Sequence, residues 1–100
     1  MSNATLAARL ERYTLKHPEE VLIVHAHVAG QPDQIVIFRG FSSSLMRPTA
    51  FDPEVPVLPD TAVISRIDRL EGPYLSQAPV YIERDIGLDE FVSRFLNPTA

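Results

Sequence analysis

Two short apolar blocks restrict the possible folds of this chain more than any other feature. The segments VLIV (residues 21–24) and IVIF (residues 35–38) are apolar at successive positions and rich in β-branched residues, which favour strands. Turn residues separate them, namely Gly30 and the pair Pro32-Asp33, so we expect an antiparallel hairpin. Because side chains alternate between the faces of a strand, these blocks imply that both faces of the sheet are covered there.

Helical periodicity occurs at the two ends of the chain. Residues 2–17 place Leu6, Leu10 and Tyr13 near one side of a helix, and Pro18 ends it because the residue before a proline disfavours helical geometry. Residues 87–98 repeat apolar side chains at helical spacing and stop at an Asn-Pro pair. One helix can cover one face of the sheet. The other face then needs a second helix, closure of the sheet into a small barrel, or a partner subunit.

Two further strands complete the predicted domain. We expect a third strand over residues 61–70 and a short fourth over residues 80–84, all within a single domain spanning residues 1–100. The predicted fold class is α+β: a small, mostly antiparallel sheet of three or four strands, open or curled into a barrel-like shape, with an N-terminal and a C-terminal helix. The hairpin over residues 20–41 and the strand over residues 61–70 should form its centre.

Composition excludes several classes of protein. A net charge of −4 disfavours a general nucleic-acid binder, since an acidic domain repels phosphates on average. The absence of cysteine excludes disulfides, thiol catalysis and thiolate zinc sites, and it agrees with a reducing compartment. No apolar run is long enough to cross a bilayer, and the N-terminus lacks the apolar core of a secretory signal. We therefore expect a cytoplasmic protein without a membrane span, and no motif indicates a cofactor.

Prolines recur through residues 42–60, and the four of them exclude a helix or a central strand. The same segment carries apolar side chains, including Met46 and Phe51, which a flexible linker would not need. We therefore expect an ordered loop over residues 41–58 that packs against the body of the domain. Because aromatic residues, methionine and arginine are enriched in interface cores, this loop is the predicted contact surface.

The run RGFSSSLMR over residues 39–47 has two interpretations. Backbone N–H groups after Gly40, serine hydroxyls and flanking arginines could together bind an anion. A phosphate loop of the usual kind has more glycines and leads into a helix, which Pro48 opposes. The favoured interpretation is therefore a polar strand exit with local serine turns. The anion-binding candidates are Arg39, Ser42, Ser43, Ser44 and Arg47.

His25 and His27 are two positions apart in a predicted strand, so their side chains project to the same face. That spacing can place two imidazoles on one metal ion, but no complete ligand set is readable from the sequence. A carboxylate such as Asp68 or Glu83 would join them only if the fold brought it near. The favoured interpretation is an ordinary half-exposed strand face, and the two histidines stay weak metal candidates.

The segment PDQIVIFRGFSSSLMRPTAFDPEVPVLP, followed by AVISRIDRLEGPY, resembles a family of small uncharacterised proteins of cyanobacteria and plant plastids. The resemblance extends from Leu10 to Phe91, and the block FRGFSSSLMRPTAFDP is its most distinctive part. It implies a photosynthetic cell, with the protein in the cytosol or the stroma. It supplies no catalytic residues.

No serine lies in a G-x-S-x-G motif or beside an identifiable base, so neither catalytic residues nor enzymatic activity is predicted. The leading expectation is a non-enzymatic interaction module, an accessory or assembly protein that contacts a protein partner or a second copy through the 41–58 loop. The alternative is a small anion-binding module for a nucleotide, a phosphorylated metabolite or RNA. The expected binding residues are Arg39, Ser42, Ser43, Ser44, Met46, Arg47 and Phe51.

Overall fold

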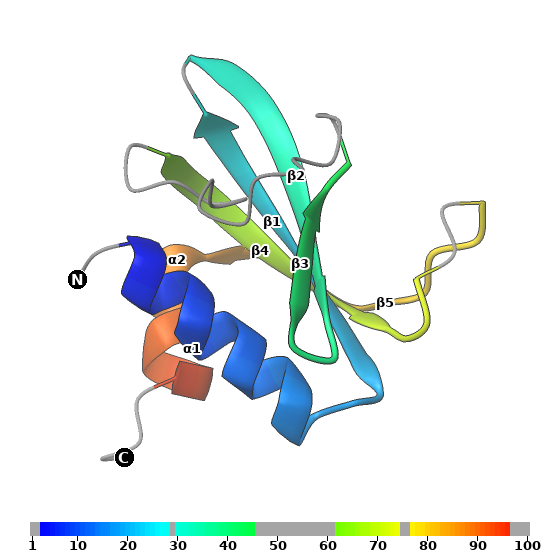
Figure 1. Cartoon of the computed structure of the whole chain (residues 1–100). Helices are drawn as coiled ribbons and strands as arrows, with labels where there is room; N and C mark the ends of the chain where they lie inside the picture. The colour runs from blue at the N-terminus through cyan, green and yellow to red at the C-terminus, as the bar shows by residue number, and fades with distance from the viewer. Residues whose placement is uncertain (1–2, 29, 46–61, 75–76, 97–100) are drawn as a thin grey trace.

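A five-stranded antiparallel sheet carries helices from both ends of the chain on one of its faces (Figure 1). The structure is a computed structural model that describes residues 3–28, 30–45, 62–74 and 77–96. The strands lie in the order β3-β2-β1-β4-β5. In chain order the elements are α1 (Asn3–Lys16), β1 (Glu20–Val28), β2 (Gln31–Phe38), β3 (Phe41–Ser44), β4 (Val63–Glu71), β5 (Tyr81–Gly87), α2 (Leu88–Phe91) and a π-helical turn η1 (Val92–Leu96).

The predicted α+β class with a helix at each end is confirmed, and the sheet has one strand more than expected. The additional strand is β3, so the prediction that residues 41–44 belong to a loop is wrong. A tight turn connects β3 to β2, with positive φ angles of 50° at Arg39 and 86° at Gly40. Since β3 and β5 each pair on one side only, the described sheet is open rather than barrel-like.

The predicted hairpin is confirmed, and its first strand is the centre of the sheet. β1 and β2 pair in register from Val21 opposite Phe38 to Val28 opposite Gln31, so Pro32 and Asp33 lie in β2 and the prediction that they form the turn is wrong. Gly30 lies in the connection with a φ of 77°, a conformation that glycine adopts without steric cost. β1 also pairs with β4, as expected for the third predicted strand.

One face of the sheet, the helix-covered face, packs against α1 and the C-terminal helical segment. Leu6, Leu10 and Tyr13 lie three or four positions apart, so α1 presents them together to the sheet. The strands contribute alternate residues, because successive side chains point to opposite faces. The buried partners from the strands and from α2 are Leu22, Val24, Ala26, Ile35, Ile37, Ile67, Ile86 and Phe91.

The opposite face, here called the helix-free face, carries a second and smaller apolar cluster. Its buried members are Val21, Ile23 and Leu70, and Val36, Phe38 and Tyr74 pack against them. No residue of a described helix belongs to this cluster. The central strands therefore bury apolar side chains on both faces, as the blocks VLIV and IVIF predict, but among the described elements only one face has helices over it.

Candidate functional site

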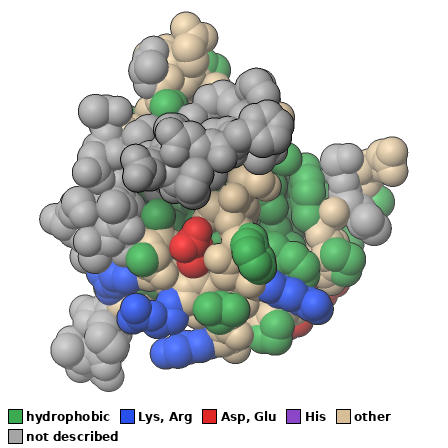
Figure 2. Space-filling model, viewed as in Figure 1, with side chains coloured by type: hydrophobic (Ala, Val, Ile, Leu, Met, Phe, Trp, Pro, Cys, Tyr) green, Lys and Arg blue, Asp and Glu red, His purple; other side chains and the backbone are tan. Residues whose placement is uncertain are grey.

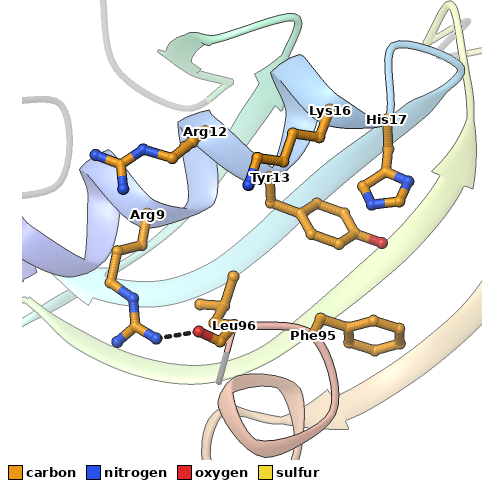
Figure 3. Close-up of a pocket in the computed structure, with 7 residues that line it drawn as sticks. All are labelled: Arg9, Arg12, Tyr13, Lys16, His17, Phe95 and Leu96. Atoms are coloured by element: carbon orange, nitrogen blue, oxygen red, sulfur yellow. Dashed lines mark hydrogen bonds between the residues drawn. The ribbon is translucent and has the colours of Figure 1, made fainter. Parts of the chain in front are cut away.

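A groove of about 520 Å³ runs between the second half of α1 and the end of the C-terminal helical segment (Figure 3). The α1 side of the groove is cationic, whereas Phe95 and Leu96 of η1 form an apolar wall opposite. The residues that line it are Arg9, Arg12, Tyr13, Lys16, His17, Phe95 and Leu96. The groove therefore joins the two ends of the chain.

A buried hydrogen-bond network holds Tyr13 at the base of this groove. The Tyr13 hydroxyl donates to the Glu20 carboxylate, 3.0 Å from Oε1. Arg69 donates from Nε to the same Oε1 at 2.9 Å, so the buried carboxylate has a cationic partner. Burial raises the pKa of Tyr13 to about 12, and the adjacent Glu20 carboxylate adds to the shift. These hydrogen bonds fix Tyr13 at the base of the groove, and Arg69 compensates the negative charge of Glu20.

Three permanent cations of α1 lie along the groove at spacings of three and four residues. Arg9 is held at the wall, because its Nη2 donates to the carbonyl oxygen of Leu96. Arg12 and Lys16 are exposed, and neither side chain pairs with a carboxylate among the described residues. Like charges at this spacing repel each other by roughly 0.2–0.5 kcal/mol per pair. The arrangement makes a positive stripe along this side of α1.

At the end of α1, His17, Glu19 and Glu20 form the one group of three metal-ligating side chains found in the described part of the chain. His17 Nδ1 lies 3.7 Å from Glu20 Oε2 and 3.9 Å from Glu19 Oε1. The Glu20 carboxylate already accepts hydrogen bonds from Tyr13 and Arg69. Because these donors compensate its charge, the group is a poor cation site.

A second polar cluster lies on the helix-free face, where His25 contacts Asp68. The distance from His25 Nε2 to Asp68 Oδ2 is 2.7 Å, and Asp68 is only 2% exposed. The other oxygen, Asp68 Oδ1, accepts the backbone N–H of Asp85 at 2.8 Å. Asp85 has a positive φ of 59° at an irregularity in the pairing of β4 with β5, and it also pairs with Arg66. Asp68 therefore fixes both the His25 imidazole and the irregular part of β5 at Asp85.

His25 and His27 line one shallow hollow of about 180 Å³, in agreement with the prediction that they share a strand face. Asp68 is the carboxylate that the fold brings to His25, whereas Glu83 instead pairs with Arg69 and Arg94. Within the described residues, neither histidine belongs to a group of three metal-ligating side chains. The pair thus stays a weak metal candidate.

The residues predicted to bind an anion near β3 do not converge in the described structure. Ser42 Oγ donates to Glu11 Oε2 at 2.7 Å, and Ser44 Oγ donates to Asp33 Oδ1 at 2.7 Å. Ser43 is exposed between them. Arg39 lies in the exposed turn before β3, 4.9 Å from the centre of the Phe38 ring. The remaining predicted residues, Met46, Arg47 and Phe51, lie outside the described residues.

A protein-family model matches residues 7–95 of the chain. The family is described as a domain of unknown function, DUF7734. The chain belongs to this family. The searches of curated proteins and of solved structures gave no match. Membership agrees with the predicted resemblance to an uncharacterised family, and it assigns no activity to the groove or to the histidine cluster of this DUF7734 chain.

The groove of this DUF7734 domain was not predicted, although its cationic side could have been recognised from the sequence. Arg9, Arg12 and Lys16 have the spacing that aligns side chains along one side of a helix. The opposite wall comes from Phe95 and Leu96, far away in the sequence, and only the packing of the fold brings them to α1.

None of the described helices is long and apolar enough to cross a membrane.

Proposed function

We propose that the protein is a non-enzymatic interaction module that binds a partner protein through the helix-free face of its sheet. The observation that carries this proposal is the position of Phe41, which is 81% exposed on the edge strand β3. Aromatic residues are enriched in the cores of protein interfaces, where a few buried side chains carry most of the binding energy.

The strand register supports the assignment of Phe41 to the helix-free face. Phe41 pairs with Phe38, which packs in the apolar cluster of that face. The next residue, Ser42, points the other way, because it bonds to Glu11 of α1. Phe41 is therefore an exposed extension of the buried cluster.

Two more exposed apolar residues adjoin the same face. Tyr81 of β5 is 38% exposed and pairs with Leu70, a buried member of the cluster. Leu45, directly after β3, is 43% exposed. Figure 2 shows hydrophobic side chains gathered between β3 and the connection from β4 to β5. The surface therefore offers an apolar centre bounded by two strand edges, and an edge strand can also pair its backbone with a partner.

The rest of the predicted contact loop belongs to the same proposal. Of residues 41–58 the structure describes only 41–45, which lie at the border of the helix-free face. Met46, Arg47 and Phe51 lie outside the described residues and stay part of the proposed contact. We also propose a cytoplasmic or stromal setting in a photosynthetic cell, which the absence of cysteine and the sequence resemblance support.

Affinity capture from a photosynthetic-cell lysate tests this proposal, with the intact protein beside a Phe41→Ser variant and a matched Leu15→Ser control. Leu15 is 62% exposed, but it lies on α1. We expect a defined partner that the intact protein and the control retain and the Phe41→Ser variant loses. Light scattering on the purified protein distinguishes self-association from a separate partner. Equal retention by all three proteins would contradict the placement of the contact on this face.

The alternative predicted function, a small anion-binding module, has separate support. The serine hydroxyls near β3 donate to carboxylates, whereas Arg12 and Lys16 in the groove along α1 offer donors without a described acidic partner. Anion binding is therefore better placed at the groove than at Arg39 and the serines.

A further inference from the structure

We propose that the groove between α1 and η1 is a binding site for a small, soluble phosphate ester. The groove lies on the helix-covered side of the sheet, so this proposal does not depend on the partner surface. Its volume of about 520 Å³ is within the range of natural small-molecule sites, roughly 300–1,000 Å³. Its lining combines cations on one side with apolar side chains on the other, which suits a ligand that has a charged group and an organic body.

The charges favour a dianion over a neutral ligand. Three of the nine Lys and Arg residues of an acidic chain gather on this one stripe of α1. Figure 2 shows blue side chains grouped over α1. Because Arg12 and Lys16 are one helical turn apart, they repel each other in the unliganded protein. A bound phosphate would remove this repulsion and accept hydrogen bonds from both side chains, and arginine matches phosphate oxygens with two parallel donors.

The carboxylates described at the end of α1 do not cancel this positive charge. Glu20 is buried below the groove, where Arg69 and the Tyr13 hydroxyl already bind it. Glu19 is exposed and lies 3.9 Å from His17, at the end of the groove. The part of the stripe formed by Arg12 and Lys16 therefore stays cationic where it faces the cavity.

The wall opposite the cations is held in place before a ligand arrives. The Phe95 ring lies 4.6 Å from the guanidinium carbon of Arg69 and 4.7 Å from that of Arg94. Its ring also meets Tyr13 edge to face, with 5.8 Å between the centroids. A preorganised apolar wall favours an organic group attached to the phosphate. We therefore assign the site to a phosphate ester rather than to inorganic phosphate alone.

Titration of the isotope-labelled protein with phenyl phosphate, followed by backbone NMR, tests the assignment. We expect saturable shifts in the second half of α1 and at Phe95 and Leu96, with tighter binding of phenyl phosphate than of inorganic phosphate. The Arg12→Gln, Lys16→Gln double variant should bind at least about tenfold more weakly, since the loss of a single charged hydrogen bond is already worth roughly that factor. Both residues are exposed, so the variant should keep its fold.

A double variant Arg66→Gln, Arg84→Gln is the matched control, because it removes two exposed arginine charges outside the groove. It should bind phenyl phosphate like the intact protein. Equal weakening in both double variants would show only a general charge effect and would overturn the site. Shifts that map away from the groove, or no saturable binding, would overturn it as well.

A phospholipid headgroup offers the same phosphate chemistry from another source. Sedimentation with phosphatidylcholine vesicles that contain phosphatidic acid provides the comparison. We expect the protein to stay in the supernatant while phenyl phosphate binds in solution. Strong sedimentation that the Arg12→Gln, Lys16→Gln variant loses would overturn the assignment to a soluble ligand.

Discussion

His25 of β1 and Asp68 of β4 are joined across the helix-free face, with 2.7 Å between Nε2 and Oδ2. The carboxylate is buried, and it also accepts the backbone N–H of Asp85. A single side chain thus connects the central strand to the irregular pairing of β4 with β5. This relationship explains how Asp85 can keep its positive φ of 59°, a conformation that non-glycine residues rarely adopt.

Replacement of Asp68 by alanine should destabilise the fold by about 1–3 kcal/mol, because the Asp85 N–H and the His25 imidazole each lose their acceptor. Urea unfolding measures the change in the free energy of unfolding. The matched control is Glu71→Ala, an exposed carboxylate on the same strand, which should alter stability by less than about 0.5 kcal/mol. Equal effects of the two substitutions would contradict the structural role given to Asp68.

Gly72 should tolerate no side chain, since it lies against the apolar cluster of the helix-free face. A Cβ at this position would come 2.6 Å from a Phe38 ring atom and 3.2 Å from a methyl group of Val21. We expect Gly72→Ala to cost about 1–3 kcal/mol, as overpacking of a cluster usually does. Gly87→Ala is the control, because the Cβ that it adds would meet nothing within 4 Å. Thermal unfolding should show a lower midpoint for Gly72→Ala only, and unchanged midpoints for both would refute this packing.

The serines of β3 should differ in their contribution to stability. Ser42 donates to Glu11 of α1 and so ties the edge strand to the helix, whereas Ser43 points away. Ser42→Ala should therefore destabilise the protein by about 1 kcal/mol, and Ser43→Ala by less than about 0.5 kcal/mol. Urea unfolding of the two variants provides the comparison. A larger loss from Ser43→Ala would show that the inward and outward faces of β3 are reversed.

The parts of the fold that the sequence predicted are those with local signals. The blocks VLIV and IVIF and the turn at Gly30 specify a hairpin within one short segment, and the structure contains it. β3 lacks such a signal, because FSSS has no apolar alternation. It becomes a strand because the turn at Arg39 and Gly40 returns it to β2, where Ser42 and Ser44 find carboxylate partners.

The candidate sites were harder to predict, because each depends on a long-range register. His25 and Asp68 are diagonal neighbours in the register of β1 with β4, in which Asp68 lies opposite Ile23 and His25 lies opposite Arg66. A register shifted by one residue would have placed Asp68 on the other face of the sheet, away from His25. The groove depends in the same way on how η1 packs beside α1, which no short segment of the sequence determines.

Tyr13 should make the stability of the protein fall with pH in the alkaline range. Its pKa is about 12 in the folded protein because of burial and Glu20, against about 10 in an unfolded chain. Between these two values the folded state holds the phenol proton that the unfolded state loses. The contribution is therefore fully present below pH 10 and is lost as the pH rises toward 12.

Urea unfolding at several pH values measures this loss of stability. The difference between the intact protein and the Tyr13→Phe variant isolates the contribution of Tyr13 from that of every other group. The Tyr13→Phe variant should be less stable at neutral pH, because Glu20 loses a donor, and its stability should fall less steeply above pH 10. Parallel curves for the two proteins above pH 10 would mean that the Tyr13 phenol is not held protonated against Glu20.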